Sequence, residues 1–134
     1  DDAFFIVAVG DNAARKREAE KATGFWPTAL IHPSAIISPS AVIKSGTVVM
    51  AGVVVQANAR VGIGAILNTG CAVDHDCIIG DYAHIAPGAH LCGHVEVGEG
   101  TLVGVGVGIA PMCKIPAWSI VKARRLEIEP LYAI

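Results

Sequence analysis

Large aliphatic residues recur at every sixth position over most of the chain. Counting in sixes from Ile31 to Val121, all 16 positions are Ile, Leu or Val. The position four residues further on is also restricted, because from Ala35 to Ser119 it is always small or β-branched. An α-helix repeats about every 3.6 residues and a strand about every 2, so neither element alone explains a repeat of six.

The repeat predicts a prism of short strands in which each hexad supplies one strand and one corner. The large aliphatic fills the interior, and the small residue lets the chain turn tightly. Glycines beside the aliphatic, such as Gly62, Gly80, Gly98 and Gly104, suit corners that need an unusual φ or a close backbone approach. With three hexads per turn, residues 31–120 make five coils. Each coil would bury its aliphatics against its neighbours.

Residues 1–24 follow a different pattern. Phe4–Val9 predicts a strand, residues 10–12 a turn, and Ala13–Lys21 a helix that ends before Gly24. Asp11 or Asn12 is the expected N-cap, because a short polar side chain there accepts a hydrogen bond from the first helical turn.

Composition narrows the class of protein. Of the 134 residues, 53% are hydrophobic and 16% charged, which excludes a disordered chain. No apolar run approaches the roughly 18 residues of a membrane-spanning helix, so we expect no membrane insertion. The net charge of −2 gives no electrostatic footprint for nucleic acid.

Residues 25–121 hold only eight of the 22 charged side chains, yet they hold all five histidines and all four cysteines. The cysteines form no CxxC pair, so we expect free thiols in small buried positions, no zinc knuckle, and a reducing, cytoplasmic setting. The cysteines are Cys71, Cys77, Cys92 and Cys113.

The densest polar cluster of the prism surrounds His75, which lies between Asp74 and Asp76. A carboxylate that accepts one ring N–H fixes the imidazole tautomer and raises the basicity of the other nitrogen, as a general base requires. A solvated face is the alternative explanation for such a cluster. Its other members are Asn68, His84, His90 and His94.

The motifs around this cluster resemble the sialic-acid O-acetyltransferase and bacillosamine-type nucleotide-sugar N-acetyltransferase group of the hexapeptide-repeat acyltransferases. The resemblance implies a mainly β chain that forms a left-handed parallel β-helix of about five coils, preceded by a strand and a helix. Its handedness comes from the resemblance, because parallel connections are otherwise right-handed. The matching stretches are Leu67–Asn68, Val73–Gly80, His84 and Leu91–Gly98.

The resemblance also implies a division of the chain. Residues 1–24 would be the remnant of an N-terminal α/β nucleotide-sugar-binding domain, whose Gly-rich loop would lie upstream. Residues 25–121 would be the left-handed β-helix acetyltransferase domain, and residues 122–134 a C-terminal cap or tail. After Val121 the sequence departs from the family pattern, where further coils hold the outer part of coenzyme A.

Residue roles follow from the same resemblance. His75 and Asp76 match the catalytic base and its partner, and Asn68 and His84 match substrate-binding residues in the cleft between subunits. Gly93, three hexads after His75, would offer its backbone N–H to the thioester oxygen. Two further candidates for contact with coenzyme A are Val105 and Trp118, with capping of the prism as the alternative for Trp118.

The implied function is transfer of acetyl from acetyl-CoA to the amino group of a UDP- or GDP-linked amino-deoxysugar, in a homotrimer with active sites between subunits. O-acetylation of a sugar or of sialic acid is the near alternative. A metal enzyme of the γ-type carbonic anhydrase class would share the fold, but the spacings of nine, six and four residues between His75, His84, His90 and His94 do not follow its ligand pattern. A non-catalytic trimeric scaffold is the third alternative.

Overall fold

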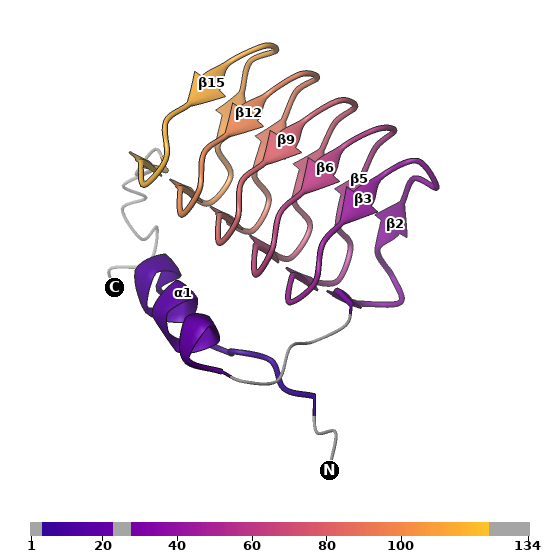
Figure 1. The fold of residues 1–134 in the computed structure, drawn as a ribbon. Coiled ribbons are helices and arrows are strands. Elements are labelled where there is room, and N and C mark those ends of the chain that lie inside the picture. The colour runs from indigo at the N-terminus through magenta and orange to yellow at the C-terminus, as the bar shows by residue number, and fades with distance from the viewer. Residues whose placement is uncertain (1–3, 23–27, 124–134) are drawn as a thin grey trace, which may run out of the picture.

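A computed structural model describes residues 4–22 and 28–123. Residues 30–121 wind into a parallel β-solenoid of about five turns, and a helix lies along its side (Figure 1). This confirms the mainly β fold and the number of coils. The predicted helix stop at Gly24 and most of the C-terminal segment lie outside the described residues.

Strands of two residues form three parallel sheets, one on each side of the prism. Sheet I contains β1 (Leu30–Ile31), β4 (Val48–Val49), β7 (Ile66–Leu67), β10 (His84–Ile85), β13 (Leu102–Val103) and β16 (Ile120–Val121). Sheet II contains β2 (Ile36–Ile37), β5 (Val54–Val55), β8 (Ala72–Val73), β11 (His90–Leu91) and β14 (Gly108–Ile109). Sheet III contains β3 (Val42–Ile43), β6 (Arg60–Val61), β9 (Ile78–Ile79), β12 (Glu96–Val97) and β15 (Lys114–Ile115).

Every strand pairs with the strand one coil away, at a register of three hexads. Leu30 pairs with Val48, and His84 pairs with both Ile66 and Leu102. Three hexads therefore complete one turn, as the repeat predicts. Because the register never changes, residues that lie three hexads apart in the sequence stack on one another along the prism.

The second residue of each strand points into the prism. Leu67, Ile85 and Leu91 are fully buried, whereas Ile78, the first residue of its strand, is 48% exposed. The small residue of each hexad also points inward, since Ala65 and Ala83 are fully buried. Each hexad thus contributes one large and one small side chain to the core, which explains why both positions are restricted in the sequence.

Corners use glycine in two different ways. Gly80 does not have a positive φ, and a Cβ there would stand 2.5 Å from the backbone nitrogen of Glu99 in the next coil. This confirms close approach for the glycines that follow the aliphatic, but the unusual φ lies elsewhere. It occurs two residues further on, at every sixth position from Gly46 to Trp118.

The N-terminal segment contains a helix but no strand among residues 4–22. Helix α1 (Asn12–Lys21) begins after the predicted N-cap Asp11, whose side chain accepts a hydrogen bond from Ala14 N–H at 2.7 Å. The predicted strand Phe4–Val9 is wrong. Residues 6–9 line a cavity with outward side chains of sheet I, where no strand edge offers backbone groups for pairing.

Arg15 joins α1 to the solenoid. Its side chain is 3% exposed, and all five of its N–H groups donate hydrogen bonds. Two of the acceptors are the carbonyl oxygens of Gly64 and Tyr82, which lie in successive coils. Asn12 adds a bond of 2.9 Å to the carbonyl of Gly100, one coil further along. The helix is therefore held against three consecutive coils.

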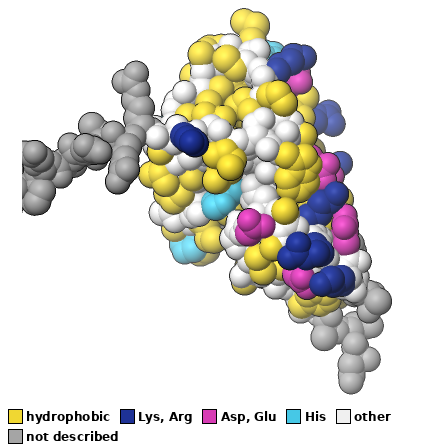
Figure 2. Space-filling view, turned by 90° about the vertical axis from the view of Figure 1, so that its left-hand side faces the viewer, with side chains coloured by type: hydrophobic (Ala, Val, Ile, Leu, Met, Phe, Trp, Pro, Cys, Tyr) yellow, Lys and Arg dark blue, Asp and Glu magenta, His cyan; other side chains and the backbone are white. Residues whose placement is uncertain are grey.

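Charged side chains gather along one edge of the molecule in Figure 2, and hydrophobic side chains spread over the rest of that side. Helix α1 carries the ion pairs Lys16–Glu20 and Lys21–Glu18 on its exposed surface. In the described part of the chain, no helix is long and apolar enough to cross a membrane.

Replacing Arg15 with alanine should release α1 and leave the β-helix folded. Each hydrogen bond to a charged group contributes about 1.5–3 kcal/mol, so amide exchange in residues 12–21 should quicken roughly tenfold or more. Hydrogen–deuterium exchange with mass spectrometry measures this. Arg17→Ala is the matched control, because the Arg17 side chain is 62% exposed. Equal protection of the helix in both variants would contradict the anchoring role of Arg15.

Candidate active site

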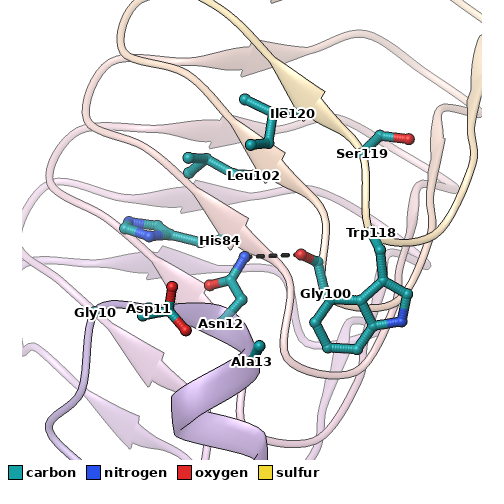
Figure 3. Close-up of a pocket in the computed structure, with 10 residues that line it drawn as sticks. All are labelled: Gly10, Asp11, Asn12, Ala13, His84, Gly100, Leu102, Trp118, Ser119 and Ile120. Atoms are coloured by element: carbon teal, nitrogen blue, oxygen red, sulfur yellow. Dashed lines mark hydrogen bonds between the residues drawn. The ribbon is translucent and has the colours of Figure 1, made fainter.

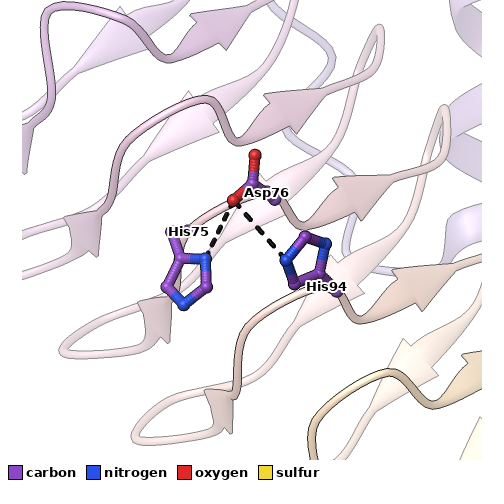
Figure 4. Close-up of side chains that lie close together, drawn as sticks. All are labelled: His75, Asp76 and His94. Carbon is purple, nitrogen blue, oxygen red and sulfur yellow. Dashed lines mark hydrogen bonds and ion pairs between the residues drawn. The ribbon is translucent and has the colours of Figure 1, made fainter.

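Three polar side chains meet at the corner between sheets II and III. The Oδ2 atom of Asp76 lies 2.9 Å from His75 Nδ1 and 3.7 Å from His94 Nε2. The two imidazole rings are nearly perpendicular, at 88°, with centroids 5.3 Å apart (Figure 4). All three side chains are open to solvent, with exposed fractions of 58% for His75, 38% for Asp76 and 59% for His94.

The backbone of this corner is left-handed without glycine. Its four left-handed residues, Asn58, Asp76, His94 and Met112, have φ of 60°, 60°, 60° and 61°. At the corner between sheets I and II, the four equivalent residues are all glycine, namely Gly52, Gly70, Gly88 and Gly106. A non-glycine residue in this conformation costs about 1–3 kcal/mol, and such strain clusters at functional sites. The chain therefore keeps side chains where the fold favours glycine.

The ring of His75 lies against Gly93, one coil further along. A Cβ at Gly93 would stand 2.6 Å from both Cε1 and Nε2 of the ring, so any side chain there would displace the imidazole. Among the described residues, none accepts a hydrogen bond from Gly93 N–H. The predicted stacking of Gly93 on His75 is thus present.

Asp76 fixes the tautomer of His75. A carboxylate only accepts hydrogen bonds, so His75 Nδ1 carries the proton and Nε2 is an unprotonated acceptor in the neutral ring. This bond from His75 lowers the pKa of Asp76, and the nearby His94 lowers it further. Asp76 therefore remains an anion that orients the imidazole and would stabilise its protonated form.

Asn68 and His84 form a second pair on the sheet I side of the prism. Asn68 Nδ2 lies 3.0 Å from His84 Nε2, while Asn68 Oδ1 accepts a hydrogen bond from Thr69 N–H at 2.8 Å. The amide nitrogen must therefore face the ring, so Nε2 is an acceptor and Nδ1 carries the proton. Burial lowers the pKa of His84, and the charge of Arg15 lowers it further, which keeps the ring neutral.

His84 borders two hollows. One, of about 220 Å³, lies between the start of α1 and the strands of sheet I, with Trp118 on its far side (Figure 3). The other, of about 330 Å³, lies under residues 6–10 and includes Asn68 and Ile66. The predicted substrate-binding pair thus lines cavities that α1 and the segment before it help to form.

A single chain does not bring all the sequence-predicted residues into one place. His75, Asp76 and Gly93 share the corner between sheets II and III, whereas Asn68 and His84 lie on the sheet I side. The reason is the length of the turn, since three hexads complete one coil and His84 lies half a turn after His75.

The two predicted coenzyme A contacts lie at the remaining corners. Val105 follows sheet I at its corner with sheet II and is 61% exposed. Trp118 lies at the corner between sheets III and I, where its ring stacks on Gly100. Lys16 of α1 lies 5.9 Å from the centre of that ring. Both corners differ from the corner that carries His75.

The sequence placed His94 in the polar cluster around His75 but assigned it no catalytic or binding role. Its signal is the interval of three hexads from Asp76, which stacks the two side chains as it stacks His75 and Gly93. Asp74 and His90 form another exposed pair on sheet II, with 3.1 Å between Oδ2 and Nε2.

The cysteines follow the prediction only in part. Cys71 and Cys77 are buried free thiols, and burial raises the pKa of Cys71 to about 12. Cys92 is only partly buried and Cys113 is exposed, so the expected burial is wrong for these two. Cys113 lies in the last full coil among the described residues.

Comparisons with known proteins agree with this architecture. The family model "Bacterial transferase hexapeptide (six repeats)" matches residues 76–111. The acetyltransferase domain of PglB from Neisseria gonorrhoeae FA1090 is 43% identical, with a TM-score of 0.84, over 88% of this chain and 58% of that one. PerB from Caulobacter crescentus, solved in complex with CoA and GDP-perosamine, is 44% identical, with a TM-score of 0.88, over 90% and 59% of the two chains. No curated protein matches the sequence.

The chain spans less than two thirds of the length of these two solved proteins. WeeI from Acinetobacter baumannii AYE, at 22% identity and a TM-score of 0.60, shares the fold alone. The sequence identity to PglB and PerB extends over most of this chain, and the hexapeptide coils are unbroken. These two observations together establish the family. The chain belongs to the hexapeptide-repeat acetyltransferases, which fold as left-handed parallel β-helices.

Proposed function

We propose that the protein transfers acetyl from acetyl-CoA to the amino group of a nucleotide-linked amino-deoxysugar, with His75 as the general base. The observation that carries this proposal is the His75–Asp76 pair, which leaves an unprotonated Nε2 on a ring that lies against Gly93. Support for the substrates comes from the relatives, since PglB was solved in complex with acetyl coenzyme A and PerB with CoA and GDP-perosamine.

The reaction follows from the placement of these groups. The sugar amine attacks the thioester carbonyl while His75 Nε2 takes a proton from the attacking nitrogen. Negative charge then develops on the carbonyl oxygen, for which Gly93 N–H is the donor. When the carbon–sulfur bond breaks, the CoA thiolate leaves and accepts the proton from His75. No covalent enzyme intermediate forms, and Asp76 stabilises the imidazolium between the two proton transfers.

The substrate-binding roles require a second copy of the chain. His75 and His84 lie half a turn apart on a convex prism, which cannot enclose two substrates by itself. In a closed trimer, the corner that carries His75 would face the Asn68–His84 side of its neighbour. Asn68 and His84 would then bind the acceptor sugar, while Val105 and Trp118 would contact coenzyme A from the other corners.

O-acetylation of a sugar hydroxyl would use the same base and the same oxyanion donor. The two reactions differ in the acceptor atom alone, so the acceptor has to be identified directly. Mass spectrometry of the product formed from matched amino and hydroxy nucleotide sugars separates them, and we expect the amino sugar to be acetylated.

His75→Ala should lower kcat about 10²–10⁴-fold, because a positioned general base contributes a factor of that size. Acetyl-CoA binding, measured by calorimetry, should barely change, since the base contacts the acceptor proton. Asp76→Asn should cost less than His75→Ala, because the imidazole remains in place. His90→Ala is the matched control, since His90 is also an exposed histidine paired with an aspartate. Near-full activity of His75→Ala with GDP-perosamine or a UDP-linked amino sugar would overturn the mechanism.

The trimer should have three times the mass of the 13.8 kDa chain by light scattering.

A mixing experiment tests whether its sites lie between subunits. His75→Ala and His84→Ala chains, each impaired alone, should recover about a quarter of wild-type activity when unfolded and refolded together, because random mixing leaves that share of sites intact. A monomeric mass, or no recovery on mixing, would contradict shared sites.

His84 should make folding stability depend on pH. Its folded pKa lies below the unfolded value because of burial and the charge of Arg15, so unfolding takes up a proton in the window below about pH 6.5. The free energy of unfolding should therefore rise with pH in that window, by at most about 1.4 kcal/mol per pH unit. Urea denaturation of His84→Asn should lack this part of the slope, whereas exposed His90→Asn should retain it. Identical slopes in the wild type and His84→Asn would contradict the burial effect.

A further inference from the structure

The corner between sheets II and III presents a set of metal-ligand donors. One ligand atom each from His75, Asp76 and His94 lies within 4.8 Å of the other two. Two imidazoles and a carboxylate are a ligand set that Zn²⁺ commonly takes, with water in the fourth position. In the described part of the chain, no other group of three such side chains comes this close.

The distances fit a shared ion. Zinc bonds to imidazole nitrogen and carboxylate oxygen are about 2.0–2.2 Å long, which separates tetrahedral ligands by roughly 3.4 Å. The observed separations from Asp76 Oδ2, 2.9 Å to His75 Nδ1 and 3.7 Å to His94 Nε2, lie on either side of that value. Small rotations of exposed side chains would bring all three donors into coordination range.

The fold also restricts where these donors can go. Asp76 and His94 occupy the same left-handed corner position in successive coils, and His94 N–H donates to the carbonyl of His75 at 3.0 Å. The backbone hydrogen bonds between coils therefore set the distance between the ligands. The absence of a side chain at Gly93 leaves the space that the His75 ring occupies.

We propose that His75, Asp76 and His94 form an inhibitory zinc site. Two nitrogen ligands favour Zn²⁺ and other late transition metals, whereas Mg²⁺ prefers oxygen ligands and octahedral geometry. The nearby Asp74–His90 pair offers two donors without a third, so it should not compete.

Inhibition follows from the two ring nitrogens of His75, and this part rests on the proposed function. When Zn²⁺ binds Nδ1, the ring proton moves from Nδ1 to Nε2, because a neutral imidazole keeps one N–H. Nε2 then has no lone pair with which to accept the proton of the attacking amine. The ion also takes up the carboxylate of Asp76, so the base loses its orienting partner.

The test is titration of the chelator-stripped full chain with ZnCl₂, followed by calorimetry and by competition with a chromophoric zinc indicator. We expect one Zn²⁺ per chain and no response to MgCl₂. His94→Gly removes one ligand, and glycine suits a residue whose φ is 60°. Loss of a group that supports a metal ligand lowers metal affinity roughly 10–100-fold. Loss of a direct ligand should weaken zinc binding by at least as much.

Two controls keep the result interpretable. His90→Ala should bind zinc as the wild type does, and circular dichroism shows whether each variant is folded. Wild-type affinity in His94→Gly, or no stoichiometric binding by the wild-type chain, would overturn the zinc site. In the activity assay, the activity of each protein with zinc is compared with its own activity without zinc. Zinc should inhibit the wild type at least about tenfold more strongly than it inhibits His94→Gly. If the chain binds zinc through His94 but transfers no acetyl group, the zinc site is supported and the proposed function is refuted.

Discussion

The backbone hydrogen bonds between successive coils are the constraint on which the rest of this molecule depends. Each strand pairs with the strand three hexads away, and the register is the same in all three sheets. This fixed register stacks side chains that are distant in the sequence. It places Gly93 against His75, His94 beside Asp76, and the ring of Trp118 on Gly100.

The same register keeps the inward side chains of the core apart from the outward side chains of the candidate active site. Inward positions are filled by two restricted residues per hexad, and they leave no polar group of the candidate site inside the prism. The functional side chains project from corners and outward strand positions, where substitution does not create a cavity in the core. The chain can therefore place Asp76 and His94 at left-handed corners, with local strain, while the stacked coils supply the stability.

Helix α1 extends this arrangement to the sheet I side. Arg15 is buried, and all five of its N–H groups donate to backbone carbonyls or to the Asn12 side chain. Its charge reaches His84 and helps to keep that imidazole neutral. Arg15 thus positions the helix that borders the hollows around His84, and its charge adds to the effect of burial on the pKa of a proposed substrate-binding group.

The sequence by itself determined the coil length, the inward positions and the stacking of Gly93 on His75, because a strict six-residue repeat has only one simple three-sided solution. Its resemblance to a family added the handedness and the residue roles. Only the tertiary structure decided which corners take a left-handed backbone, that residues 4–9 form no strand, and how close the His94 ring comes to Asp76. These features depend on contacts between coils and on the surface that α1 covers, and such contacts leave no local pattern in the sequence.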